Sequence, residues 1–227
     1  MLYIVSTPIG NLKDITLRAL EVLKEVDVII CEDTRRTKIL LNHYNIKKQL
    51  ISFFEYNRNR RLPLIINLLT KGKKCALVSD AGLPCISDPG FTIVRDCIKK
   101  NIPVTVIPGP EAVLSSLVVS GLPTSKFVFL GFLTHKAKRR KRLLESYLST
   151  FSEFTVIFFE SCHRLIKTLS FLKEIDSQRE VVVIKELTKL YERAFRGSPQ
   201  EVINQILENS QVKGEFVILI GPKNYRI

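Results

Sequence analysis

Short runs of apolar, often β-branched residues alternate along the chain with stretches whose apolar positions recur at helical spacing. The first kind of run is typical of buried strands and the second of amphipathic helices. The pattern predicts strands at Leu2–Ser6, Asp27–Cys31, Leu50–Phe53, Cys75–Ser79, Val104–Ile107, Phe127–Phe132, Thr155–Phe159, Glu180–Lys185 and Glu215–Ile220. It predicts helices at Ile15–Lys24, Thr37–Tyr44, Arg60–Leu69, Phe91–Lys100, Ala112–Val119, Lys138–Leu148, Arg164–Lys173 and Pro199–Glu208.

Strands that alternate with helices in this way predict an α/β fold with largely parallel sheets. The alternation is interrupted by Gly121 and Pro123, in a segment where neither a strand nor a helix pattern continues. We therefore expect two α/β domains, one at residues 1–119 and one at residues 120–227, each with about five strands or fewer.

Three predicted helices begin at residues that are typical of helix N-termini. Asp14 precedes the first predicted helix and can accept from its free N–H groups. Asp88, followed by Pro89 and Gly90, predicts a capped helix start, because a proline at the first helical position loses no hydrogen bond. Ser198 before Pro199 repeats that signal ahead of the last helix.

The charge of the chain points to an anionic partner. Lys plus Arg number 35 and Asp plus Glu 22, which leaves a net charge of +13. Nucleic acid is the first candidate, an anionic membrane surface the second, and a basic background with no specific partner the third. The excess is spread over both halves, which favours a surface that both contribute to over a detachable basic arm.

The cysteines and the apolar runs bear on metal binding, membrane contact and cellular location. No two of the five cysteines have the spacing of a zinc site, so no metal is expected. Cys31, Cys75 and Cys162 lie in apolar contexts and are predicted to be buried thiols. The N-terminus lacks the pattern of a signal peptide, and no apolar run approaches the roughly 18 residues of a membrane span. We expect a cytoplasmic protein without membrane contact.

Polar, Gly- and Pro-rich loops follow several of the predicted strands, at Ser6–Asn11, Glu32–Arg35, Ser79–Gly90 and Pro108–Pro110. In open α/β sheets, ligands bind at loops that follow the carboxyl ends of strands. The loops lack the three glycines of a dinucleotide fingerprint and the lysine of a P-loop, so a pyrophosphate ligand is not expected. A cationic cofactor without phosphate, such as a sulfonium compound, fits them better.

Two charged clusters at strand ends are candidates for chemistry. Asp33 and Arg35 share one turn, where a carboxylate can position a hydroxyl and a guanidinium can bind a phosphate. The alternative is an ordinary helix start, in which the acidic groups favour the positive end of the helix dipole. Glu160, His163 and Arg164 form a second such cluster in the other half.

Two basic segments are candidates for RNA contact. Residues 136–142 contain six basic side chains in seven positions, a repulsive helix start that calls for a counter-anion. Arg58, Arg60 and Arg61 follow Phe53, Phe54 and Tyr56, and aromatic residues interleaved with arginines suit RNA whose bases are unpaired. For the mixed-charge stretch formed by Arg179–Glu180, Lys185–Lys189 and Glu192–Gly197 we expect a solvated face, although Lys185 and Glu186 directly follow the apolar run Val181–Ile184.

The motifs, taken in order, resemble the tetrapyrrole methylase superfamily, and within it the branch that methylates small-subunit ribosomal RNA. The resemblance runs from residue 3 to about residue 222, and the segment SDAGLPCISDPG at 79–90 is its most specific part. The other matching segments are STPIGNL at 6–12, EDTR at 32–35, IPGPEA at 107–112, SGLP at 120–123, GFL at 131–133, ESCHRL at 160–165, REVVVIKELTK at 179–189, ERAFRG at 192–197 and KGEF at 213–216. Leu83, Glu111, Thr134 and Cys162 depart from the residues usual in that family.

The resemblance implies two α/β domains with S-adenosyl-L-methionine in the cleft between them, a homodimer, and a 2′-O-methylcytidine in the decoding region of small-subunit (16S) ribosomal RNA as the product. The substrate would be this RNA or the 30S subunit. By position in the motifs, the cofactor contacts would be Pro8, Asp80, Ala81, Gly82, Ile86, Ser87, Ala112, Leu130 and Phe159.

The reaction so implied is attack of a ribose 2′-oxygen on the cofactor methyl group, with loss of the hydroxyl proton to a base. Asp33, Glu160 and His163 are the candidate bases, and Arg35 and Arg164 the candidate phosphate contacts. The expected RNA-binding residues are Arg58, Arg60, Arg61, Lys136, Lys138, Arg139, Arg140 and Arg164. Two alternatives stay open: carbon methylation of a corrin or porphyrin precursor, and RNA binding without catalysis.

Overall fold

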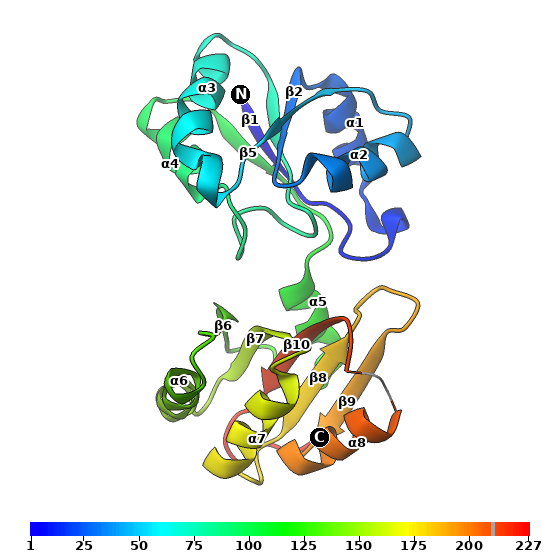
Figure 1. The fold of residues 1–227 in the computed structure, drawn as a ribbon, viewed down its shortest axis with the longest axis vertical. Helices are drawn as coiled ribbons and strands as arrows, with labels where there is room; N and C mark the ends of the chain where they lie inside the picture. Colours follow the sequence, from blue (N-terminus) through cyan, green and yellow to red (C-terminus); the bar gives the residue numbers. More distant parts are fainter. Residues whose placement is uncertain (210–211) are drawn as a thin grey trace. The chain divides into compact units, whose positions relative to one another are not determined.

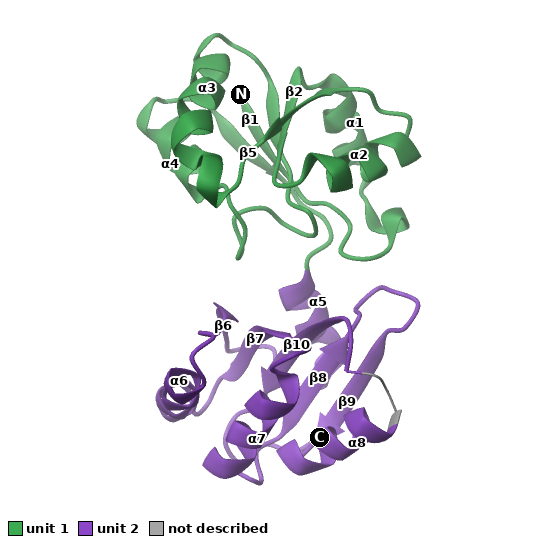
Figure 2. Cartoon of the chain, in the orientation of Figure 1, with its two compact units in different colours: residues 1–111 green, residues 112–227 purple. Residues whose placement is uncertain are grey.

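The structure is a computed structural model that describes residues 1–209 and 212–227, with the side chain of residue 209 left undescribed. The chain divides into two compact units, Met1–Glu111 and Ala112–Ile227 (Figure 2). The predicted division after residue 119 lies at the end of helix α5 (Ala112–Ser120), whereas the structural division precedes that helix. The reason is packing: Val113 and Leu117 of α5 belong to a core cluster of the second unit.

The first unit, in which Figure 1 labels β1, β2 and β5, is a five-stranded parallel sheet in the order β3-β2-β4-β1-β5. Its strands are β1 (Leu2–Val5), β2 (Val28–Cys31), β3 (Gln49–Ser52), β4 (Cys75–Leu77) and β5 (Val104–Ile107). Its helices are α1 (Leu17–Glu25), α2 (Thr34–His43), α3 (Arg58–Thr70) and α4 (Phe91–Lys99), with short 3-10 turns η1 (Leu12–Asp14) and η2 (Glu55–Asn57).

Both faces of this sheet are covered, as a parallel sheet requires. Ile65 of α3 and Ile93 of α4 pack against one face, together with Ile4 and Ile30 of the strands. Leu23 of α1 and Leu41 of α2 belong to the cluster on the other face. This three-layer arrangement brings the carboxyl ends of all five strands to one edge, where the loops after them meet.

The second unit is a five-stranded sheet in the order β6-β7-β10-β8-β9. Its strands are β6 (Phe127–Phe132), β7 (Thr155–Ser161), β8 (Val181–Lys185), β9 (Arg193–Gly197) and β10 (Glu215–Ile220). Besides α5, its helices are α6 (Ala137–Thr150), α7 (Leu165–Ile175) and α8 (Pro199–Asn209). Side chains of α6, α7 and α8 form the core on one face, and α5 packs on the other.

Two expectations fail in this unit. The sheet is mixed: only β6 and β7 pair in parallel, whereas β10 is antiparallel to β7 and β8, and β9 to β8. The stretch expected to be a solvated face includes strand β9, in which Phe195 is buried under the helices. The expectation of about five strands or fewer in each unit is confirmed, with β9 added to the four strands named for the second unit. Cys31 and Cys75 are buried as predicted, whereas Cys162 is half-buried.

Candidate active site

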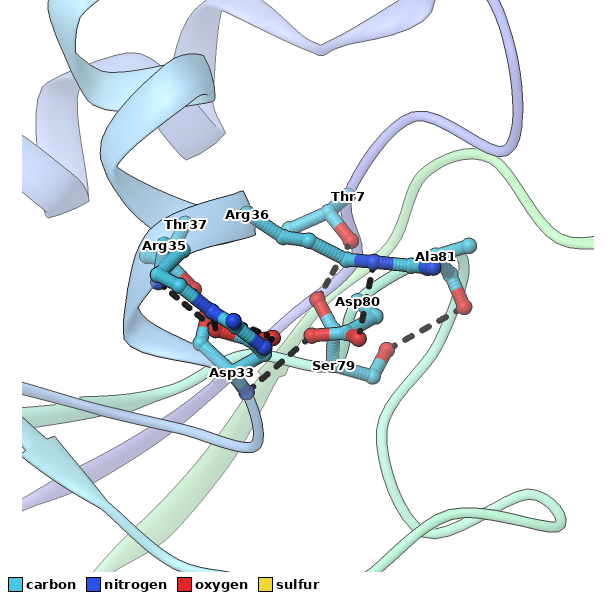
Figure 3. A network of polar contacts seen from close by, with 8 residues as sticks. All are labelled: Thr7, Asp33, Arg35, Arg36, Thr37, Ser79, Asp80 and Ala81. Atoms are coloured by element: carbon cyan, nitrogen blue, oxygen red, sulfur yellow. Dashed lines mark hydrogen bonds and ion pairs between the residues drawn. The ribbon is translucent and has the colours of Figure 1, made fainter.

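The loops after β1 and β4 are joined at the carboxyl edge of the first sheet (Figure 3). Thr7 and Gly82 exchange two backbone hydrogen bonds of 2.9 Å each. The Thr7 hydroxyl also donates to the Ser79 carbonyl at 3.1 Å. Gly82 has φ +82°, and a Cβ there would lie 3.3 Å from Cγ2 of Ile9. The bridge thus holds Pro8 and Gly82, both predicted cofactor contacts, in neighbouring loops.

Asp80 connects the β4 loop to the β2 loop. Its Oδ1 accepts the Asp33 N–H at 3.2 Å, and its Oδ2 lies 3.5 Å from Nε of Arg36. Asp80 is therefore held between two elements, and the structure brings this predicted cofactor contact together with the predicted catalytic residue Asp33 (Figure 3).

Asp33 and Arg35 form a two-pronged ion pair. Arg35 Nη2 lies 2.7 Å from Asp33 Oδ2, and Arg35 Nε donates to Oδ1 at 3.1 Å. The hydrogen bonds from the Arg35 side chain and backbone lower the pKa of Asp33 to about 2. A carboxylate with that pKa is a weak proton acceptor near neutral pH, because it holds a proton poorly. The Arg35 side chain remains largely exposed and is available to an anion.

Carboxylates gather beside this pair. Burial, and then the charges of Glu32 and Asp80, raise the pKa of Asp88 to about 6, while a hydrogen bond with Ser79 acts in the opposite direction. Burial and the charge of Asp80 likewise raise the pKa of Glu32. Burial is the first cause of both shifts and the neighbouring carboxylates are the second, so a cation bound at this edge would favour the ionised forms of Asp88 and Glu32.

The remaining predicted cofactor contacts in the first unit, Ala81, Ile86 and Ser87, lie exposed on the β4 loop. Ser87 has φ 64° and Cys85 φ 72°, in the left-handed region that residues other than glycine rarely adopt. Such strained positions concentrate at ligand-binding sites, where the fold around them supplies the compensating energy. The three remaining predicted contacts, Ala112, Leu130 and Phe159, belong to the second unit.

Two of those three residues share one face of the second sheet. Ala112 and Phe159 pack against the core cluster that includes Val182 and Leu219. Leu130 packs against the cluster on the other face of the sheet. Phe159 lies 5.0 Å from Phe129, centroid to centroid, in an edge-on contact.

Glu160, at the end of β7, is the centre of a buried polar network. Its side chain has no exposed area, and its Oε1 lies 2.6 Å from Nη2 of Arg164. The same oxygen accepts the Ser161 N–H at 2.8 Å, and Oε2 accepts the Thr168 hydroxyl at 2.7 Å. Nε of Arg140 lies 3.9 Å from Oε2. With both oxygens engaged inside the protein, Glu160 is placed to hold elements together and not to meet a substrate hydroxyl.

Arg164 and Arg140, the two arginines of this network, have largely buried side chains that bond to groups inside the unit. The Arg164 side chain is 13% exposed and donates to Ser161 Oγ and to the Leu133 carbonyl, with Nη1 3.0 Å from Nδ1 of His135. The Arg140 side chain is 3% exposed and donates to the carbonyls of Thr134 and His135. Burial lowers the pKa of Arg140. In contrast, the candidate base His163 is exposed on the turn before α7.

The other basic residues predicted for RNA lie at two helix starts. Arg58, Arg60 and Arg61 open α3, where Arg58 Nη1 pairs with Glu55 Oε1 at 3.1 Å. Lys136, Lys138 and Arg139 are exposed at the start of α6. In the part of the chain that the structure describes, no group of three or more His, Cys, Asp or Glu side chains could hold a metal ion. Over those same residues, no helix is long and apolar enough to cross a membrane.

Sequence reasoning placed Thr7, Glu32 and Asp88 in the loops at this edge but did not choose them as site residues. All three lie inside the motifs that carried the resemblance, next to residues that were chosen. The signal that could have found them is their position at strand ends, because a buried hydroxyl or carboxyl there needs a partner in a neighbouring loop.

Comparison with known proteins is consistent with this architecture. The family model described as Tetrapyrrole (Corrin/Porphyrin) Methylases matches residues 1–203. The chain belongs to this family. Among solved tetrapyrrole methylases, a cobalt precorrin-4 methyltransferase superposes with a TM-score of 0.68, covering 97% of this chain and 94% of the other at 16% identity. A uroporphyrin-III C-methyltransferase from Thermus thermophilus, solved with S-adenosylhomocysteine, has a TM-score of 0.65 at 17% identity and covers 97% and 96%. These likenesses establish the fold alone.

Curated relatives within the family are closer in sequence. A protein of Thermotoga maritima named ribosomal RNA small subunit methyltransferase I is 49% identical, over 98% of this chain and 98% of its own length. A protein of the same name from a Hydrogenobaculum species is 45% identical, over 98% of this chain and 96% of its own length.

Proposed function

We propose that the chain is an S-adenosyl-L-methionine-dependent methyltransferase that acts on the 2′-oxygen of a cytidine ribose in small-subunit ribosomal RNA. The observation that supports methyl transfer to small-subunit ribosomal RNA is the near full-length identity of 49% with a relative named ribosomal RNA small subunit methyltransferase I. The cytidine 2′-oxygen as target rests on the family resemblance of the motifs. The carboxyl edge of the first sheet supports the proposal. Its carboxylates suit a cofactor that is cationic at sulfur, and its loops lack the motifs that bind a pyrophosphate.

The residues of that edge fit such a cofactor. Glu32, Asp80 and Asp88 concentrate negative charge beside the loops that hold Pro8 and Gly82. Gly82 adopts a positive φ, and a side chain at this position would press against Ile9. When bound, S-adenosyl-L-methionine supplies an activated methyl carbon: the ribose oxygen bonds to it as the carbon–sulfur bond breaks, leaving S-adenosylhomocysteine, while the hydroxyl proton passes to a base.

The chain's own contribution is alignment and removal of that proton. Alignment of two reactants contributes up to roughly 7–11 kcal/mol, and a positioned base about 10²–10⁴-fold in rate. Asp33 keeps Arg35 oriented through two contacts, which suits binding of the phosphate next to the acceptor ribose. His163 is the candidate base whose exposure suits contact with a substrate.

The first experiment uses 16S RNA and 30S subunits that lack the modification, with the enzyme and a methyl-labelled cofactor. Digestion to nucleosides and mass spectrometry should detect labelled 2′-O-methylcytidine. Label on another atom or nucleoside would overturn the cytidine 2′-O assignment. No label in either RNA, together with cofactor binding measured by calorimetry, would overturn the proposed substrate.

A pair of acidic variants tests the cofactor edge. Asp80→Asn removes a charge that lies between the β2 and β4 loops, so we expect weaker cofactor binding in calorimetry. Asp96→Asn is the matched control, because Asp96 lies on α4 and pairs with Arg95 at 3.3 Å. Equal cofactor affinity in both variants would contradict the placement of the cofactor at this edge.

A substrate of this kind places the enzyme in the compartment that holds ribosomes. The family resemblance also leads us to propose a homodimer. Light scattering on a sizing column tests this, and a monomeric mass at working concentration would contradict it.

A further inference from the structure

Tyr56 is the most exposed of the three aromatic residues that follow β3. Its relative exposure is 96%, whereas Phe53 is 2% exposed and belongs to the core. Phe54 is half-buried, and its ring meets the Tyr56 ring edge-on at 6.4 Å between centroids. Of the aromatic residues that the sequence placed beside the arginines, Tyr56 is therefore the one whose ring is presented to solvent.

The turn that carries Tyr56 is held by hydrogen bonds of the Asn57 side chain. Asn57 Oδ1 accepts the Phe54 N–H at 3.0 Å, and Asn57 Nδ2 donates to the Ser52 carbonyl at 3.1 Å. The same nitrogen lies 3.3 Å from Ser52 Oγ. The backbone of the turn is thus held before a ligand binds, so little backbone entropy is lost when a ligand covers the ring.

The turn lies at the edge of the sheet that carries the candidate chemistry. β3 pairs in parallel with β2, with Ser52 opposite Cys31, and the Phe53 N–H donates to the Cys31 carbonyl at 2.8 Å. Asp33 and Arg35 follow Cys31 closely in the chain. A ligand that contacts Arg35 can therefore reach the neighbouring loop that holds Tyr56.

Positively charged residues follow Tyr56 closely in the chain. Arg60 is exposed in the first turn of α3, and Arg61 is half-buried one residue further on. The Nε atom of Arg61 is buried and has no hydrogen-bond partner in the structure. An exposed aromatic ring on a hydrogen-bonded turn, followed closely in the chain by arginines, matches the way that proteins bind single-stranded RNA, by base stacking combined with phosphate contact.

We propose that Tyr56 stacks on an unpaired base of the RNA substrate while Arg60 and Arg61 contact the adjoining phosphates. The identity of the RNA rests on the proposed function, but the stacking surface does not. A paired base is already stacked on both sides and offers no free face to the ring. An acidic peptide could pair with the arginines, but its acidic side chains offer no flat ring that stacks on Tyr56.

The absence of tryptophan from the chain gives a direct test. Tyr56→Trp introduces a single tryptophan at the exposed position, and a short unpaired RNA should quench its fluorescence by stacking. Ile98→Trp is the control, because Ile98 is 65% exposed in the last turn of α4, away from the loops at the strand ends. Its fluorescence should stay unchanged over the same RNA concentrations.

Two further ligands separate stacking from charge. An RNA duplex of the same length and heparin both carry the anionic charge but present no free base. If either of them quenched the fluorescence of the Tyr56→Trp variant to the extent seen with unpaired RNA, the proposal would be overturned. The absence of quenching by unpaired RNA would overturn it as well.

Turnover gives the second readout. Stacking on one base is worth roughly 5- to 150-fold in affinity, so Tyr56→Ala should raise the KM for RNA within that range and leave kcat nearly unchanged. Tyr56→Phe keeps the ring and should keep the wild-type KM. An unchanged KM in Tyr56→Ala would overturn the stacking role.

The outcomes separate the two proposals. Methyl transfer to ribosomal RNA without quenching at position 56 would overturn the stacking surface and leave the proposed function in place. Quenching by unpaired RNA without methyl transfer to small-subunit RNA would overturn the proposed function and leave the stacking surface in place.

Discussion

Thr7 and Gly82 are 75 residues apart in sequence, yet their backbones exchange hydrogen bonds as an isolated antiparallel bridge. The strands that lead to them, β1 and β4, run parallel. The two loops therefore turn back on one another at the carboxyl edge, and the Thr7 hydroxyl secures this turn at the Ser79 carbonyl. The site is assembled by loop-to-loop contacts in addition to the sheet beneath it.

Thr7→Val tests the hydroxyl of this bridge. The variant keeps the shape of the side chain but leaves the buried Ser79 carbonyl without its donor, a loss of about 1–3 kcal/mol. We expect a lower free energy of unfolding in urea and a weaker cofactor affinity in calorimetry. Thr70→Val is the control, because the Thr70 hydroxyl donates to a carbonyl at the end of α3, in an exposed position. Equal losses in the two variants would show that the bridge does not depend on the hydroxyl.

Gly82→Ala tests the close approach of the two loops. Gly72→Ala is a matched control, because Gly72 has φ +83° against +82° for Gly82 but would place its Cβ in open space. Both variants should lose about 1 kcal/mol from the left-handed backbone. Gly82→Ala should also displace Ile9 and reduce methyl transfer, which Gly72→Ala should leave unchanged. Wild-type transfer by Gly82→Ala would place the cofactor elsewhere.

Asp88 predicts a pH dependence of stability. Its pKa is raised from 3.8 to about 6, so the folded protein holds this proton more tightly than the unfolded chain does. Its contribution to the free energy of unfolding is therefore greatest below pH 3.8 and is lost as the pH rises through about 6. The slope for one proton is at most about 1.4 kcal/mol per pH unit. Asp88→Asn should remove it.

The measurement is urea unfolding of wild type and Asp88→Asn across this range. The stability of the variant relative to wild type should rise with pH, because only the wild type acquires a buried charge. Parallel profiles for the two proteins would show that Asp88 titrates normally.

Glu160→Gln distinguishes a structural from a catalytic carboxylate. The variant leaves Arg164 and the buried Arg140 without their counter-charge, which should cost about 3–5 kcal/mol. We expect a large fall in the urea midpoint and lower activity in proportion to the loss of folded protein. Glu174→Gln, which removes an exposed partner of Lys141, should have no measurable effect. Wild-type stability with abolished turnover in Glu160→Gln would instead identify Glu160 as the base.

The sequence predicted several strands with their observed bounds. Val104–Ile107, Phe127–Phe132 and Glu215–Ile220 are mainly apolar runs, which are recognised from the sequence whether the strand is buried, as β10 is, or half-buried and exposed, as β6 is. β9 was missed because Phe195 is its one fully buried side chain, and the charged residues around it read as solvated. The pairing direction in the second unit was also missed, since strand direction depends on partners distant in the sequence.

Helix starts show the limit of local signals. Ser198 caps α8 as predicted, in a reciprocal exchange with Glu201. Asp14 does not cap α1: Thr16 does, through the Ala19 N–H at 3.1 Å. Asp88 does not cap α4, which begins after Gly90 with φ 141°. Asp88 is half-buried among other acidic groups, and that environment depends on three loops at once.

The same holds for the site. The motifs located the loops, and the structure brings Pro8, Gly82, Asp33 and Asp80 to one edge. Charge alone could not separate Arg140 from Arg139, because adjacent residues on a helix face different directions. Only the packing of α6 on the sheet shows that one is internal and the other external.

The buried Arg140 has a consequence for the basic helix as a whole. Arg140 is anchored on the buried face of α6 together with Leu144 and Leu148, and this face sets the rotation of the helix about its own axis, which decides which of its remaining cations face outward. The order of residues 136–142 therefore carries information that their total charge does not. Two relatives with the same number of lysines and arginines in this segment would differ in the surface they present, unless both keep an arginine at the anchored position.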